Sequence, residues 1–174
     1  MYRILTVALV VLGMFGPGAS FALAQATTAD PVQPPPPPPV PPNLTPGQLV
    51  LWYTAKAAEL ADRCVAGNRS AAAAAVSIIE QLRAAGEDAK ARLVGHWAID
   101  SLTLRNDRCL REIRELAFRV GRLILQAGGT REQVEQVQQV AAEQSRRVVA
   151  SRQAAIERIR AAIGEPQEGT PAGG

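Results

Sequence analysis

Histidine and methionine are almost missing from this sequence. His96 is the only histidine, and no methionine lies beyond residue 24. A metal site or catalytic triad built on histidine must therefore use His96, and thioether ligands for copper are missing after residue 24. Asp100 follows His96 by four residues, on the same face of a helix, as two ligands of a zinc site would. No third ligand can be identified, and the sequence predicts no metal site and no cofactor.

Motifs for nucleophilic or phosphate chemistry are also absent. Nucleophilic catalysis needs a serine or cysteine held beside a base and an oxyanion hole, yet the serines after residue 24 occur in helical contexts without a glycine-rich elbow. The glycines are scattered and form no phosphate-binding loop. We therefore expect no catalytic residue and a protein that is not an enzyme. Paired carboxylates for glycoside chemistry remain open, because their separation depends on the tertiary fold.

Lysine is scarce as well, because only Lys56 and Lys90 among 19 basic residues are lysine. The basic residues are interleaved with 16 acidic ones rather than gathered in runs, which is typical of a solvated surface. We therefore expect no nucleic-acid partner. The richness in arginine and alanine is typical of a GC-rich bacterial genome.

Residues 1–24 have the pattern of a secretory signal. Arg3 precedes an apolar run from Ile4 to Leu12, and Ala22-Leu23-Ala24 forms a small-x-small cleavage site. We expect cleavage before Gln25 and a periplasmic or secreted bacterial protein. An uncleaved membrane anchor is the alternative, although the apolar run is short for a bilayer span.

Residues 25–44 are predicted to form a proline-rich spacer. The stretch PVQPPPPPPVPP, 31–42, cannot join a helix or sheet, because proline lacks the amide hydrogen and fixes φ. It favours a polyproline II rod, a stiff spacer about 37 Å long at roughly 3.1 Å per residue. The composition of residues 164–174 predicts a disordered tail.

Residues 45–163 are predicted to form an all-α domain, a small antiparallel bundle of about four helices. Proline is absent from 47 to 165, and apolar residues recur with helical spacing. We expect helices over about 46–66, from a cap at Ser70 to Gly86, over 87–127 and over 130–163. A bend near Asn106-Asp107 would divide the third helix in two, and both possibilities remain open.

Two cysteines, Cys64 and Cys109, each lie on the apolar face of their predicted helix. Export would carry them to an oxidising compartment, which predicts a disulfide between the first and third predicted helices. Their separation excludes a CxxC redox motif.

The third predicted helix has an arginine-rich face opposite its apolar one. At 100° per residue, Leu102, Ile113 and Val120 fall on one side and a series of arginines on the other. We expect this face to bind a partner, beside exposed apolar positions of the last helix. Solvation with pairs such as Arg108–Glu112 and Arg111–Glu115 is the alternative. The candidate residues are Arg108, Arg111, Arg114, Arg119 and Arg122.

The stretch NLTPGQ, 43–48, has the features of a helix start. Thr45 suits the N-cap, Pro46 the first helical position, and Gln48 can complete a capping box. Leu44 and Leu49 occupy the positions of a hydrophobic staple.

The same stretch resembles the LTxxQ motif of the Spy/CpxP family of small periplasmic helical proteins. In that family the motif typically occurs twice, and a partial second copy, GTREQ at 129–133, opens the last predicted helix with glycine in place of leucine. The motif residues here are Leu44, Thr45, Gln48, Thr130 and Gln133.

The resemblance implies an all-helical and often dimeric protein that acts as an envelope-stress chaperone, a stress-signalling regulator or a metal-resistance accessory. It implies binding of unfolded polypeptides without ATP, through a surface that mixes apolar and basic groups. The scarcity of histidine and methionine weighs against the metal-handling branch. The expected partners are therefore other proteins, with a homodimer as a further possibility.

A structural role is the alternative. The proline-rich spacer suits a subunit that reaches across the periplasm, either a type IV secretion minor-pilin-like protein or a spanin-like coiled coil. A membrane contact is expected only if residues 1–24 are retained.

Overall fold

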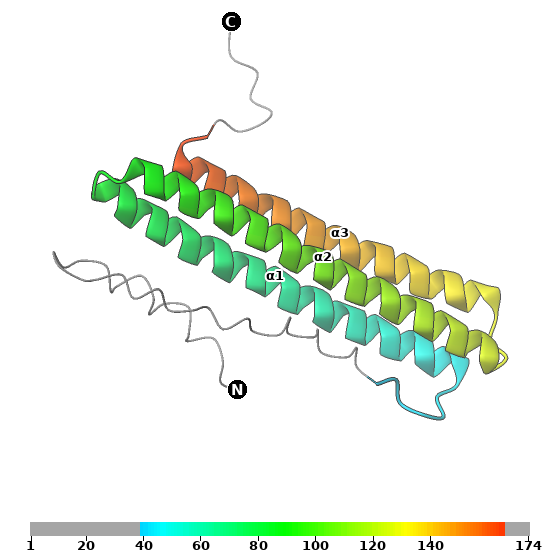
Figure 1. The fold of residues 1–174 in the computed structure, drawn as a ribbon. Coiled ribbons are helices and arrows are strands. Elements are labelled where there is room, and N and C mark those ends of the chain that lie inside the picture. The colour runs from blue at the N-terminus through cyan, green and yellow to red at the C-terminus, as the bar shows by residue number, and fades with distance from the viewer. Residues whose placement is uncertain (1–38, 166–174) are drawn as a thin grey trace, which may run out of the picture. The chain divides into compact units, whose positions relative to one another are not determined.

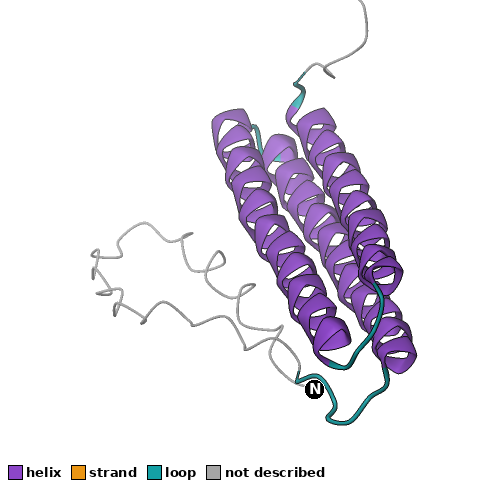
Figure 2. Ribbon diagram, turned by 90° about the vertical axis from the view of Figure 1, so that its right-hand side faces the viewer, coloured by secondary structure: helices purple, strands orange, loops and turns teal. Residues whose placement is uncertain are grey.

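A computed structural model describes residues 39–165, which form three long α-helices. α1 (Pro46–Ala84) and α3 (Arg131–Ile163) run in the same direction, and α2 (Asp88–Gln126) returns between them (Figure 1). Each helix packs against the other two (Figure 2). The described residues contain no strand, which confirms the all-α class. The signal at 1–24, most of the proline-rich spacer and the tail beyond 165 lie outside the described residues.

The predicted count of four helices is wrong, because α1 continues through 66–70. Ser70, the expected cap, lies inside the helix. The Gly67-Asn68 pair predicts a break, since glycine disfavours helix and an asparagine side chain competes for backbone hydrogen bonds. In the structure the Asn68 side chain points into the bundle and bonds Asn106 instead. Tertiary packing thus overrides local propensity at this site.

α2 is likewise one helix, without a break at 106–107. Asn106 is buried, and its amide donates to the Leu102 carbonyl oxygen at 2.7 Å and to Asn68 Oδ1 at 2.8 Å. Asp107 faces outward and pairs with Arg152 of α3 at 3.4 Å. The polar dipeptide therefore connects α2 to both neighbours.

The core has two apolar clusters. One lies toward the end where α1 and α3 begin and includes Tyr53, Ile113 and Val148. The other lies toward the opposite end and includes Ile79 and Ile159. The Tyr53 hydroxyl donates to the Ile113 carbonyl at 3.3 Å, and burial raises its pKa. No helix within residues 39–165 is long and apolar enough to cross a membrane.

The predicted disulfide between Cys64 and Cys109 is present, and it joins α1 to α2 across a Cα–Cα distance of 6.5 Å. Both cysteines lie at the inner side of their helices, with Cys64 buried in the first cluster and Cys109 packed against it. A disulfide is typical of a protein that folds in an oxidising compartment, as exported proteins do.

Candidate functional site

The five candidate arginines of α2 divide into an exposed group and one exception. Arg108, Arg111, Arg114 and Arg122 are exposed, as the helical spacing predicts. Arg119 is only partly exposed, and its Nε and Nη2 atoms are buried without a hydrogen-bond partner. It lies eight residues after Arg111, about 80° around the helix at 100° per residue, and so at the edge of the exposed face. There it borders a small hollow with Val40 and other residues.

The four exposed candidate arginines are not neutralised by neighbours in the described part of the chain. The expected pairs of Arg108 with Glu112 and of Arg111 with Glu115 do not form, and within residues 39–165 none of the four has an ion pair or a side-chain hydrogen bond. By contrast, Arg147 and Arg152 of α3 both pair with aspartates of neighbouring helices. The guanidinium groups on the outer side of α2 therefore remain available to an anionic partner.

Large apolar side chains share this side of α2. Five of them, which we call the outer stripe, have between 56 and 72 % of their surface exposed. The outer stripe consists of Leu93, Trp97, Leu104, Phe118 and Leu125. At 100° per residue these positions fall within about 80° of one another, on the side of α2 opposite its buried residues. The helix is thus apolar on two sides, although only one of them faces the core.

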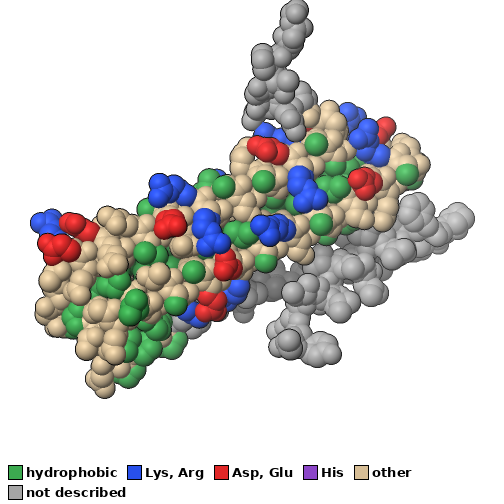
Figure 3. Space-filling model, turned by 180° about the vertical axis from the view of Figure 1, so that it is seen from behind, with side chains coloured by type: hydrophobic (Ala, Val, Ile, Leu, Met, Phe, Trp, Pro, Cys, Tyr) green, Lys and Arg blue, Asp and Glu red, His purple; other side chains and the backbone are tan. Residues whose placement is uncertain are grey.

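The expectation of exposed apolar positions on the last helix is wrong in the main. Most of its large apolar residues are buried, including Val148, Ile156 and Ile159, and Val149 is its only large one among the exposed apolar side chains of the described residues. The other seven exposed large apolar side chains of the described residues lie on α1 and α2, and α2 carries five of them. In Figure 3 hydrophobic side chains gather at the end where α1 and α3 begin, and charges of both signs lie along the face and at the upper edge of that end.

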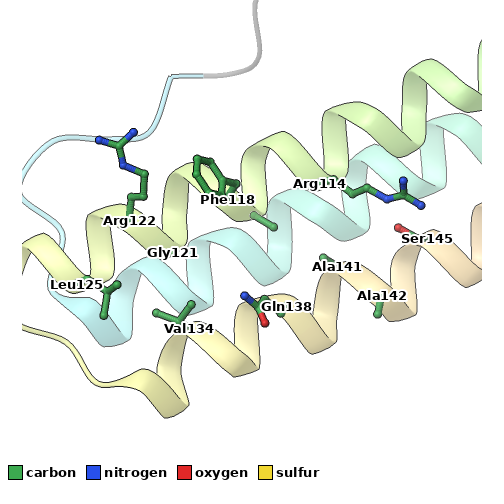
Figure 4. A pocket seen from close by; sticks show the side chains of 11 residues that line it. Arg114, Phe118, Gly121, Arg122, Leu125, Val134, Gln138, Ala141, Ala142 and Ser145 are labelled. Carbon is green, nitrogen blue, oxygen red and sulfur yellow. The ribbon is translucent and has the colours of Figure 1, made fainter.

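A groove of about 620 Å³ runs between α2 and α3 beside the outer stripe. Phe118 and Leu125 line it from α2, and Val134 and Gln138 line it from α3 (Figure 4). Small residues keep it open; at Gly121, an added Cβ would meet Val134 Cγ1 at 3.3 Å. The arginines at its rim are Arg114 and Arg122, and the remaining lining residues are Ala117, Ala141, Ala142 and Ser145.

Both copies of the LTxxQ-like motif form helix caps at the same end of the bundle. Thr45 with Gln48, and Thr130 with Gln133, each form a complete capping box. The hydrogen bond from Thr130 and the local backbone lower the pKa of Glu132. Position 129 has no room for a side chain, because an added Cβ would lie 2.8 Å from Pro46 Cβ and 2.5 Å from Ile124 Cγ2. The leucine expected of the motif does not fit there.

His96 and Asp100 do not act together. His96 is exposed and its Nε2 lies 3.4 Å from Glu165 Oε1, while Asp100 has no ion pair within the described part of the chain. No three His, Cys, Asp or Glu side chains among residues 39–165 are grouped so that they could hold a metal ion.

Comparisons with protein-family models, with curated proteins and with solved structures find no match for this chain. We call the side of α2 that carries the outer stripe and the exposed arginines Arg108, Arg111, Arg114 and Arg122 its outer face.

Helical spacing predicts the exposed arginines of α2, whereas the outer stripe was not predicted from the sequence. The signal was nevertheless present, because positions 97, 104, 111, 118 and 125 are spaced by seven residues, and four of the five are large and apolar. The buried side of the same helix carries a stronger apolar pattern, which dominates the sequence signal.

Proposed function

We propose that this exported protein is not an enzyme and binds other polypeptides through the outer face of α2, as an ATP-independent, chaperone-like factor. The observation that carries the proposal is the coincidence, on one side of one helix, of the outer stripe with four arginines that have no ion pair among the described residues. The second LTxxQ-like cap and the disulfide agree with an envelope protein of this kind, periplasmic or secreted.

The chemistry of the face suits unfolded chains. Each Å² of exposed apolar surface that a partner covers contributes roughly 25 cal/mol to the free energy of binding. A single large side chain is common on a surface, but a row of them is a feature of interaction sites. Unpaired arginines add attraction for acidic segments and speed their encounter. Both contributions are reversible and require no nucleotide.

The test is light scattering from a chemically denatured client, diluted with and without the protein purified after export. We expect suppressed aggregation, and we expect the combined variant Leu104→Ser with Phe118→Ser to lose it. Leu51→Ser is the matched control, because Leu51 is on α1 and as exposed as Leu104, at 72 %. For charge, Arg111→Glu is compared with Arg146→Glu, since Arg146 is an exposed arginine of α3.

A dedicated partner in an envelope assembly is the second candidate, and one observation favours it. Seven-residue spacing suits a helix laid along α2, whereas a mobile unfolded client needs no fixed spacing. If the wild-type protein fails to suppress aggregation of any of several clients, the chaperone hypothesis is wrong and the accessory-subunit hypothesis remains.

A further inference from the structure

We infer that the outer face of α2 pairs with the same face of a second copy of this chain, antiparallel and centred on Arg111. The inference rests on the proposed function, since it names a partner for the same polypeptide-binding face. Three observations carry it: the spacing of the outer stripe, the sizes of its side chains and the charges that flank it.

The spacing favours a helix as the partner. Trp97, Leu104, Phe118 and Leu125 occupy a seven-residue repeat with Arg111 at its middle. A repeat of seven keeps a seam facing one neighbouring helix along its whole length, because two helices that coil around each other have 3.5 residues per turn. From 97 to 125 the seam spans about 42 Å at 1.5 Å per residue.

The side-chain sizes favour the antiparallel direction. Trp97 and Leu125 are equally far from Arg111, and so are Leu104 and Phe118. An antiparallel pair therefore places each aromatic ring against a leucine, and alternating large and small side chains pack well across an interface. A parallel pair would place tryptophan against tryptophan and phenylalanine against phenylalanine. Antiparallel helices also bring opposite ends of their dipoles together.

The flanking charges complement one another. Asp107 and Arg114 lie on one flank of the seam, on either side of Arg111 and at similar distances from it. In the antiparallel pair Asp107 faces Arg114 of the second copy. On the other flank Arg108 faces Glu115 of the second copy, and symmetry gives four such contacts. Asp107 also contacts Arg152 of its own chain at 3.4 Å, but its side chain remains 54 % exposed.

The centre of the pair is its one unfavourable contact, because Arg111 meets Arg111 of the second copy. Repulsion there would keep the dimer weak enough to dissociate and release the face for clients. Dimer formation and client binding thus compete for the same residues.

Cysteine cross-linking tests the geometry directly. Helices packed 8–10 Å apart, with Cα atoms about 2.3 Å from each axis, leave facing Cα atoms roughly 5 Å apart, within reach of a disulfide. We expect Arg111→Cys to form a disulfide-linked dimer on mild oxidation, identified by mapping the 111–111 peptide so that exchange with Cys109 is recognised. Arg146→Cys on α3 is the control and should stay unlinked. No linkage beyond that control would overturn the inference.

A mixture tests the direction. When Leu104→Cys and Phe118→Cys proteins are combined, the antiparallel pair predicts mixed 104–118 dimers in excess of either homodimer. Homodimers alone would indicate parallel pairing and overturn the inference.

Charge exchange provides a test without cysteine. Asp107→Arg or Arg114→Asp alone should lower the dimer fraction measured by sedimentation, and the two changes in one chain should restore it. Arg111→Leu should tighten the dimer by about tenfold. Failure of the double change to restore the dimer would contradict the proposed contacts.

The two proposals fail separately. If the protein is a monomer that suppresses aggregation through Leu104 and Phe118, the proposed dimer is wrong and the proposed polypeptide binding stands. If Arg111→Cys forms the cross-linked dimer but the wild-type protein protects no client, only the chaperone-like function is contradicted. The oxidised Arg111→Cys dimer should protect clients less than wild type.

Discussion

Asn68 and Asn106 exchange two hydrogen bonds inside the bundle. Asn68 Nδ2 donates to Asn106 Oδ1 at 3.0 Å, and Asn106 Nδ2 donates to Asn68 Oδ1 at 2.8 Å. Both side chains are 1 % exposed, and Ser151 Oγ of α3 lies 3.4 Å from Asn68 Nδ2. This polar layer separates the two apolar clusters and touches all three helices. It therefore fixes the axial register of helices whose apolar faces alone would permit sliding.

Removing one partner of this pair should cost more than removing both. Asn68→Leu leaves the Asn106 amide buried without its partner, and the free energy of unfolding should fall by about 1–3 kcal/mol. Asn68→Leu combined with Asn106→Leu should recover much of that loss, because neither asparagine is then left buried without the other. Urea denaturation of the two single variants and the double variant measures the coupling. Strictly additive losses would show that the pair does not act as a unit.

The disulfide should supply a large part of the stability. Cys64 and Cys109 are 45 residues apart, and closing such a loop in the unfolded chain contributes about 4 kcal/mol in the chain-entropy model. The combined variant Cys64→Ala with Cys109→Ala should therefore melt on the order of 10–20 °C lower. Thermal unfolding followed by circular dichroism measures this. As a control, reductant should lower the melting temperature of the wild type and leave that of the variant unchanged.

The glycine that replaces the leucine of the motif should tolerate no side chain. Gly129→Leu would drive the new atoms into Pro46 and Ile124 at the junction of α1 with α3, and overpacking of this kind costs about 1–3 kcal/mol. Gly47→Ala is the matched control: it lies within the first turn of α1, and an added Cβ has nothing within 4 Å.

We expect Gly47→Ala to raise the free energy of unfolding by up to about 1 kcal/mol, because alanine favours the helix. Chemical denaturation of both variants gives the comparison. If Gly129→Leu were as stable as the wild type, the junction would be looser than the distances indicate.

The helical class, the last helix and the disulfide could be predicted from the sequence because they depend on local signals. Apolar spacing set the helices, Thr130 and Gln133 set a helix start, and two cysteines on apolar faces set the bridge. The continuity of α1 could not be predicted. It depends on Asn106, a partner 38 residues away from Asn68, and local sequence carries no information about that contact.

The candidate site was only half predicted, for a related reason. Helical spacing places Arg111 and Arg114 outside, and it also places Phe118 there, but an apolar residue on a predicted helix is ordinarily assigned to the core. Only the packed bundle shows which side of α2 its neighbours cover. Arg119 illustrates the converse, because its Nε and Nη2 atoms are buried although the spacing predicts an exposed side chain.

Two leucines of α2 separate stability from binding. Leu102 is 2 % exposed and Leu104 is 72 % exposed, although they differ by only two positions. Leu102→Ala should lower the free energy of unfolding by about 2–5 kcal/mol, because it leaves a cavity in the core. Leu104→Ala should change it by no more than about 0.5 kcal/mol, as for other surface positions. Denaturation at a protein concentration low enough to keep the chain monomeric measures both. If Leu104→Ala also reduces self-association and client protection while the fold stays intact, the outer stripe serves binding. A large loss of stability in Leu104→Ala would instead show that Leu104 stabilises the fold.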